Sequence, residues 1–308
     1  MALNVNGLTA YVNQERMQLI KKMILGGRSM NFLTIQPDIK SAASINLLSS
    51  NLVAQAGGCG FTDAGETILT QNTLNVCPLK VNESICIDTL EQYYTQVMLA
   101  PGSYDTDFGF EQLYTEEKVS QISSLIDTLI WQGDTSLTGQ TGLCDGFVTL
   151  AETTYSASTV DGNTSNATAI TANNIVSLVD DMVAAVPVNI IANDDLYLYM
   201  GYDTYRLYAL ALRNQNLFHY TGAEDQGEQF SQMIPGTNVR AIAVKGLNGT
   251  NKMFLSAKSN LYAGVDLMSD YENLEIFYSM DFQEVRVVAK WKMGVNAAFW
   301  DYVVYFSL

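Results

Sequence analysis

The chain has 308 residues, enough for one large domain or two ordinary ones around a sizeable core. Its net charge of −16 argues against nucleic-acid binding as the main task, because phosphate contacts need Lys and Arg. Apolar residues make up 48% and charged residues 16%, whereas soluble domains usually carry roughly 25% charged residues. This composition favours a surface that other subunits cover, and the alternative is a β-rich soluble protein with a polar Ser/Thr/Asn surface.

The N-terminal segment is basic. Residues 1–40 hold five basic residues against two acidic ones, a balance of +3 that leaves −19 on the rest. Residues 8–25 show the apolar spacing of an amphipathic helix that ends at Gly26-Gly27. Such a segment docks on another chain, faces nucleic acid, or packs as a terminal helix of its own molecule. The chain shows neither a secretory signal nor an apolar run of membrane-spanning length, so we expect it to be made and used in a cytosol.

Residues 41–92 read as an extended excursion. The run Gly57-Gly58-Cys59-Gly60 marks a turn, and Thr67–Thr70 and Leu74–Val81 are typical of strands. Pro78 cannot donate to a central ladder, so we expect its strand to lie at a sheet edge or to break there. A two-stranded excursion is marginal alone and needs another surface to lie on.

The clearest helix is Thr115–Asp134. Its apolar residues share one side: Val119, Ile122, Leu125, Ile126, Leu129 and Ile130. We expect Thr115 to cap its start and Gly133 to end it in a left-handed turn.

Strands and helices alternate after this helix. We expect a short strand at Leu143–Leu150, a polar loop at Ala151–Ala169, a helix at Thr171–Val186, a strand at Asp195–Met200 and a helix at Tyr202–Leu212. Val239–Val244 and Lys252–Ala257 are predicted to pair with each other around a Gly-containing turn.

The C-terminal region predicts two strands. Every odd position from Val285 to Val295 is apolar, the pattern of a long half-buried strand, and Tyr302–Phe306 is a nearly continuous apolar strand. We expect Leu125 and Leu129 to be buried against the strand that holds Val287 and Trp291.

A mid-chain helix closed by Trp131-Gln132-Gly133-Asp134, followed near the end by the strand Arg286–Val295, resembles the major capsid proteins of tailed bacteriophages, which share the Hong Kong 97 fold. The resemblance implies an α+β fold in five parts: residues 1–40 an N-terminal arm, 41–92 an extended β-hairpin loop, 93–150 and 259–308 a peripheral domain with a long spine helix on a β-sheet, and 151–258 an α/β axial domain.

The function that the resemblance implies is self-assembly into the icosahedral shell around a phage genome. The expected partners are other copies in pentamers and hexamers, separate scaffold and portal proteins, possible decoration proteins, and DNA held non-specifically at the inner face, with no membrane. The expected location is the virion capsid, and the host cytoplasm during assembly. The alternatives are an encapsulin-type compartment, a β-rich carbohydrate-active enzyme, and a surface-layer or adhesin protein, which the missing signal segment disfavours.

The sequence holds few residues in the arrangements that catalysis or metal binding requires. No motif of a hydrolase nucleophile, phosphate loop or zinc protease occurs. His219 is the one histidine in the sequence, and its neighbours are aromatic. The segment that begins at Asp161 starts like a calcium-binding loop, but it lacks the Gly at the sixth position and the Glu at the twelfth. We therefore expect no catalytic residue, no metal site and no cofactor.

The cysteines are Cys59, Cys77, Cys86 and Cys144, without a Cys-x-x-Cys pair. Three of them lie in the excursion. One expectation is a disulfide from Cys59 to Cys77 or Cys86 in an oxidising medium, and the alternative is that the cysteines are small apolar residues that fill gaps.

Overall fold

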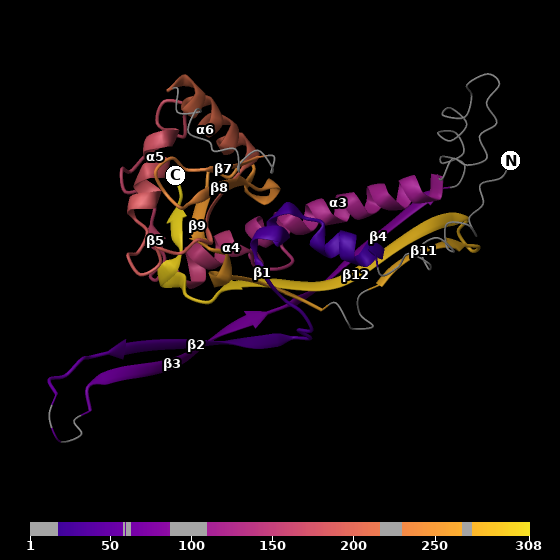
Figure 1. Cartoon of the computed structure of the whole chain (residues 1–308). Helices are drawn as coiled ribbons and strands as arrows, with labels where there is room; N and C mark the ends of the chain where they lie inside the picture. Colours follow the sequence, from indigo (N-terminus) through magenta and orange to yellow (C-terminus); the bar gives the residue numbers. More distant parts are fainter. Residues whose placement is uncertain (1–17, 58, 60–62, 87–109, 216–229, 267–272) are drawn as a thin grey trace.

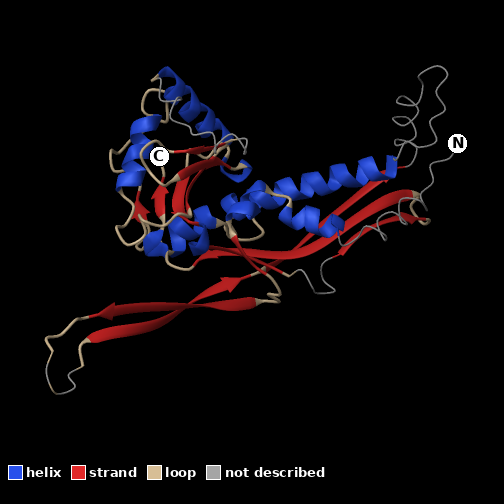
Figure 2. Cartoon of the chain, viewed as in Figure 1, coloured by secondary structure: helices blue, strands red, loops and turns tan. Residues whose placement is uncertain are grey.

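The computed structural model describes residues 18–57, 59, 63–86, 110–215, 230–266 and 273–308. Three parts are visible in Figure 1: a long helix lying along long strands, a more compact unit that contains α5 and α6, and a hairpin that projects away from both. Figure 2 shows two long strands, drawn in red, along the body of the hairpin. The described strands form sheets of five, six and two strands.

The long helix is α3 (Phe110–Gln132), which confirms the predicted helix. It begins before the expected cap: Thr115 is buried inside the helix and does not start it. Gly133 follows the helix as expected, but it does not adopt a left-handed conformation. Glycine is needed there because a Cβ would lie 2.1 Å from the carbonyl oxygen of Cys144.

The sheet beneath α3 is built around one long strand, β12. Its strands are β1 (Thr34–Gln36), β10 (Leu261–Val265), β12 (Glu284–Ala297), β11 (Asn273–Ser279) and β4 (Cys77–Cys86). The predicted alternation is confirmed, because the odd positions of β12 from Val285 to Val295 are all buried. β4 pairs only with β12 among the described strands, so Pro78 does lie in an edge strand, opposite Lys292.

Helix α3 and this sheet share one core. Leu129 is buried and Leu125 half-buried in the cluster that contains Val287 and Trp291, as predicted. A helix at residues 18–25 joins the same cluster through its buried side chains Leu19, Ile20, Met23 and Ile24. This part of the expected arm therefore packs within its own molecule. Residues 1–17 lie outside the described residues.

The second sheet carries α5 (Ile175–Ala184) and α6 (Tyr202–Asn214). Its strand order is β5 (Val160–Asp161), β13 (Val304–Phe306), β9 (Met253–Ala257), β6 (Leu196–Met200), β8 (Arg240–Ala243) and β7 (Ser231–Met233). The expected pairing of Val239–Val244 with Lys252–Ala257 is wrong, because β6 lies between β8 and β9. The last strand also differs from expectation: β13 pairs with β9 and β5 instead of completing the sheet beneath α3.

The expected strand at Leu143–Leu150 is wrong. The chain instead forms a helical turn, α4 (Phe147–Thr149), followed by the π-helical turn η2 (Leu150–Thr154). Phe147, Val148 and Ala151 are all buried. A helical turn can bury such a set on one side, whereas a strand would send Phe147 and Val148 to opposite faces.

The hairpin is formed by β2 (Ala42–Leu52) and β3 (Gly65–Asn75), paired in register from Ala42 with Asn75 to Leu52 with Gly65. These strands are longer than the sequence indicated. None of the described helices has the length and apolarity to cross a membrane.

The core beneath α3 gives a direct test. Leu129→Ala should lower the free energy of unfolding by about 2–5 kcal/mol, because it removes a buried side chain and leaves a cavity. Urea denaturation of the subunit measures this change. Leu137→Ala, at an exposed leucine in the loop after the same helix, is the control and should change stability by less than about 0.5 kcal/mol. Equal midpoints for the Leu129 variant and wild type would contradict the packing.

Candidate assembly surfaces

The projecting hairpin carries an apolar pair in solvent. Leu48 and Leu69 are directly opposite each other across the two strands, and 63% and 76% of their surfaces are exposed. Leu52, on the same face near the end of β2, is 89% exposed. A two-stranded hairpin has too little core to be stable alone, and clustered exposed leucines typically mark a contact surface. The exposed face of this hairpin is therefore a candidate contact surface.

Polar pairs on that face fix its register. The amide of Gln71 donates to the side-chain oxygen of Asn46 at 2.9 Å, and the hydroxyls of Ser50 and Thr67 are 3.2 Å apart. These pairs occupy the positions before and after the leucines along the ladder. A slip by one residue would break both pairs and turn the leucines to the other face.

A second exposed apolar group lies at the turn between β11 and β12. Phe277, Met280 and Phe282 are exposed there, and the guanidinium of Arg286 lies 4.5 Å from the centre of the Phe282 ring. This turn and the hairpin tip are at opposite ends of the molecule (Figure 1). Different apolar patches at two ends suit head-to-tail contacts between copies, which close into rings when the rotation between neighbours permits.

The root of the hairpin is anchored on the end of β12. Ile39, Ile45, Leu74 and Ala298 form a small apolar cluster. At Gly294 the chain passes so close that a Cβ would lie 1.8 Å from the carbonyl oxygen of Asn75. Only glycine leaves room for this crossing.

Amide groups complete the root. The side chain of Asn72 donates to the carbonyl of Ala297 at 2.7 Å and accepts from the hydroxyl of Tyr155 at 2.8 Å. Asn296 donates to the carbonyl of Thr73 at 2.8 Å. These bonds join β3, β12 and the residue that follows η2, so the hairpin projects from a fixed base.

The cysteines pair differently from the expectation. Cys77 is bonded to Cys144, with their Cα atoms 6.0 Å apart, while Cys59 and Cys86 are free and exposed. A bond from Cys77 to Cys59 is thus excluded in this structure. No pattern in the sequence identifies this partner, because Cys144 follows α3 and meets β4 only in the folded chain.

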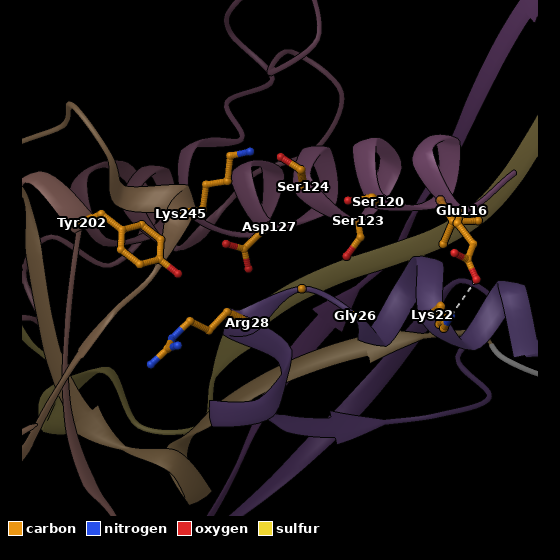
Figure 3. Close-up of a pocket in the computed structure, with 12 residues that line it drawn as sticks. Lys22, Gly26, Arg28, Glu116, Ser120, Ser123, Ser124, Asp127, Tyr202 and Lys245 are labelled. Atoms are coloured by element: carbon orange, nitrogen blue, oxygen red, sulfur yellow. Dashed lines mark ion pairs between the residues drawn. The ribbon is translucent and has the colours of Figure 1, made fainter. Parts of the chain in front are cut away.

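A groove of about 450 Å³ runs between the helix at residues 18–25 and α3 (Figure 3). Asp127 is buried at its floor, where its carboxylate accepts from the backbone N–H of Ser29 at 2.9 Å and of Gly246 at 3.2 Å. Lys22 faces Glu116 across the groove at 3.6 Å. Asp127 therefore joins three separate chain segments, and both of its oxygens are already used.

Among the described residues, no group of three or more His, Cys, Asp or Glu side chains could hold a metal. Asp161 accepts from the backbone N–H of Asn163, which makes a local turn. His219 lies outside the described residues.

Buried tyrosines are the most strongly perturbed titrating groups. Burial raises the pKa of Tyr199 well above its usual value, and the Tyr199 hydroxyl donates to the carbonyl of Phe32 at 2.6 Å. Burial, with Glu83 nearby, raises the pKa of Tyr114 to about 12. Both residues stay neutral at physiological pH, where they serve packing and hydrogen bonding.

No protein-family profile and no curated protein matches this sequence. Solved structures do match. A chain of the satellite phage P4 procapsid, which includes the size-determination protein, is 14% identical with a TM-score of 0.61, over 95% of this chain and 90% of that one.

Two further structures agree. A chain of the capsid of Myoviridae phage XM1 is 13% identical with a TM-score of 0.55, over 91% of each chain. A chain of the native GTA particle capsid is 10% identical with a TM-score of 0.53, over 92% of this chain and 89% of that one. The chain therefore has the α+β, Hong Kong 97-type fold that its sequence patterns predicted.

Asp127 provides a test of the groove. Asp127→Asn replaces one carboxylate oxygen with an NH₂ group that faces a backbone donor, so we expect a loss of about 1–3 kcal/mol in the free energy of unfolding. Chemical denaturation measures it. Glu117→Gln, at an exposed carboxylate on the same helix, is the control. Equal losses in both variants would show that the buried contacts of Asp127 contribute nothing specific.

The raised pKa of Tyr199 predicts that the free energy of unfolding depends on pH in the alkaline range. Its folded pKa lies above the unfolded value of about 10, so its contribution is complete below that pH and is lost as pH rises through the folded pKa. From about one pH unit above the unfolded pKa up to the folded pKa, each such tyrosine lowers the free energy of unfolding by about 1.4 kcal/mol per pH unit. In Tyr199→Phe the free energy of unfolding, measured by urea denaturation, should therefore decline less steeply with pH in the alkaline range than in wild type. The difference between the two proteins at pH 7 is the reference. Parallel curves would contradict the prediction.

Proposed function

We propose that this chain is the shell-forming subunit of a tailed-bacteriophage capsid, a structural protein with no enzymatic activity. Its support is the capsid-type fold, which extends over nearly the whole chain and over nearly the whole of each matched capsid chain. The low fraction of charged residues agrees with a surface that neighbouring copies cover.

The observation that carries the proposal is the projecting hairpin. Its leucine pair, Leu48 and Leu69, is exposed in the single chain, and the hairpin root is nevertheless held by buried side chains. A rigid base with an uncovered apolar end is what a contact between subunits requires. Burial of this surface in an assembly would stabilise both the hairpin and the contact.

The finer parts of the proposal follow the division made from sequence. Residues 1–40 would form the arm, 41–92 the extended loop, 93–150 and 259–308 the peripheral domain, and 151–258 the axial domain. Copies would associate as pentamers and hexamers in the host cytoplasm and end in the virion capsid. Separate scaffold and portal proteins, possible decoration proteins and non-specifically held DNA complete the expected partners.

Assembly of the purified chain tests the function. Expressed alone or with a candidate scaffold protein, it should form pentamers, hexamers, tubes or shells in electron microscopy and analytical ultracentrifugation. A stable monomer at high concentration would overturn the proposal. Shells that load a protein cargo through a short docking peptide would instead identify an encapsulin-type compartment.

Substitutions on the hairpin test the contact itself. Leu48→Asn combined with Leu69→Asn should abolish assembly but leave the melting temperature of the subunit nearly unchanged, because both side chains are exposed in the single chain. Light scattering and calorimetry measure the two effects. The control exchanges the neighbouring hydroxyl pair (Ser50→Thr with Thr67→Ser) and should assemble. Normal shells from the leucine variant would exclude this face as an interface.

A further inference from the structure

The place where the hairpin joins the body is covalently fastened. Strand β3 ends at Asn75, β4 begins at Cys77, and the crossing over β12 lies between them at Gly294. Cys77 is thus the first residue of the body after the hairpin. It lies opposite Met293 in the ladder.

The partner of Cys77 comes from a distant part of the chain. Cys144 is buried in the loop between α3 and α4, 67 residues further along the chain. That loop is held to the end of α3, because the N–H of Gly146 donates to the carbonyl of Gly133 at 2.8 Å. The disulfide therefore ties the hairpin root to the C-terminal end of the long helix.

The disulfide lies at the start of an edge strand. β4 has a single partner strand among the described strands, and Pro78, the residue after Cys77, has no N–H to donate. The N–H of Val76 donates to the carbonyl of Ser41, which belongs to the hairpin side of the crossing. With both thiols reduced, the start of β4 would keep its pairing with β12 but lose its covalent tie to the loop after α3.

We propose that Cys77 and Cys144 form a thiol–disulfide latch that adds a covalent tie to the noncovalent contacts of the hairpin root and makes the root more rigid. With the thiols reduced, as in a reducing cytosol, the root opens locally more often and the hairpin can adjust its direction. With the disulfide closed, in an oxidising medium, the direction is fixed. The latch is a property of the subunit and does not depend on shell formation.

The closing reaction uses a small-molecule disulfide such as oxidised glutathione. The half-buried Cys77, as thiolate, attacks one sulfur of the oxidant, so that a mixed disulfide forms and one small thiolate leaves. The Cys144 thiolate then attacks the Cys77 sulfur, which closes the protein disulfide and releases the second small thiolate. Two protein thiols are oxidised, one small disulfide is reduced to two thiols, and the protons of the protein thiols pass to the released thiolates or to solvent.

The other cysteines provide an internal control. Cys59 lies toward the hairpin tip and Cys86 ends β4, and both are exposed and free. Cys59→Ser combined with Cys86→Ser removes every other thiol and should leave the latch intact. Cys144→Ser removes the latch.

The test uses the full chain in oxidised and reduced glutathione buffers. Thiol titration after denaturation should find two free thiols in the oxidised protein and four in the reduced protein. Amide exchange at residues 72–79 should be about tenfold faster in the reduced protein, with exchange in β6, β8 and β9 unchanged. The double-serine variant should show the same redox response in amide exchange, with no free thiol when oxidised and two when reduced. In amide exchange, Cys144→Ser should resemble reduced wild type in both buffers.

Several results would overturn the latch. These are four free thiols after oxidation, equal exchange at the root in both states, or a redox response that persists in Cys144→Ser. If Cys144→Ser does not fold, the comparison of reduced and oxidised wild type still decides. If amide exchange at the root responds to oxidation in subunits that never assemble, the latch stands and the proposed function falls. If the subunits form normal shells but exchange at the root is the same in both redox states, the proposed function stands and the latch falls.

Discussion

The burial of Trp131 at the end of α3 is the contact on which the rest of the fold depends. Its ring lies 5.2 Å from Phe147, 5.1 Å from Tyr199 and 5.3 Å from Phe254, measured between ring centres. Its indole N–H donates to the hydroxyl of Ser29 at 2.7 Å. One side chain thus touches the turn after α3, two strands of the second sheet and the segment that follows the helix at residues 18–25. Because the indole is fully buried and its N–H is satisfied, the end of α3 has one position relative to both sheets.

The hairpin depends on that position indirectly. β12 extends from the sheet beneath α3 to the hairpin root, where Asn296 bonds Thr73 and accepts from the indole of Trp300 at 2.9 Å. The hairpin therefore takes its direction from a strand that α3 holds in place. An exposed contact surface can be presented at a defined angle only if its base is rigid, and the rigidity here comes from the main core of the molecule.

The spacing of apolar residues predicted those helices and strands that bury one face and expose the other. β12 alternates because one of its faces lies on α3, and α3 shows its apolar stripe for the same reason. Pairing between distant strands was not predictable: β8 and β9 are close in sequence, but α6 returns the chain so that β6 enters between them, in a parallel pair with β8. The turn at Phe147 was mistaken for a strand because a short apolar run fits both structures. The partner of Cys77 and the reason for Gly133 both depend on the loop that approaches after α3, which no local pattern reveals.

The line that β3 and β4 follow has a mechanical consequence. The two strands run on in nearly one direction across the root (Figure 1), and β4 pairs with β12 from Cys77 to Cys86. Ladder hydrogen bonds stand perpendicular to the strands, so tension along the hairpin would load them together in shear and would not peel them apart one after another. The covalent bond at Cys77 would meet that tension first. The segment with the least core of its own is therefore the one whose attachment best resists a lengthwise pull.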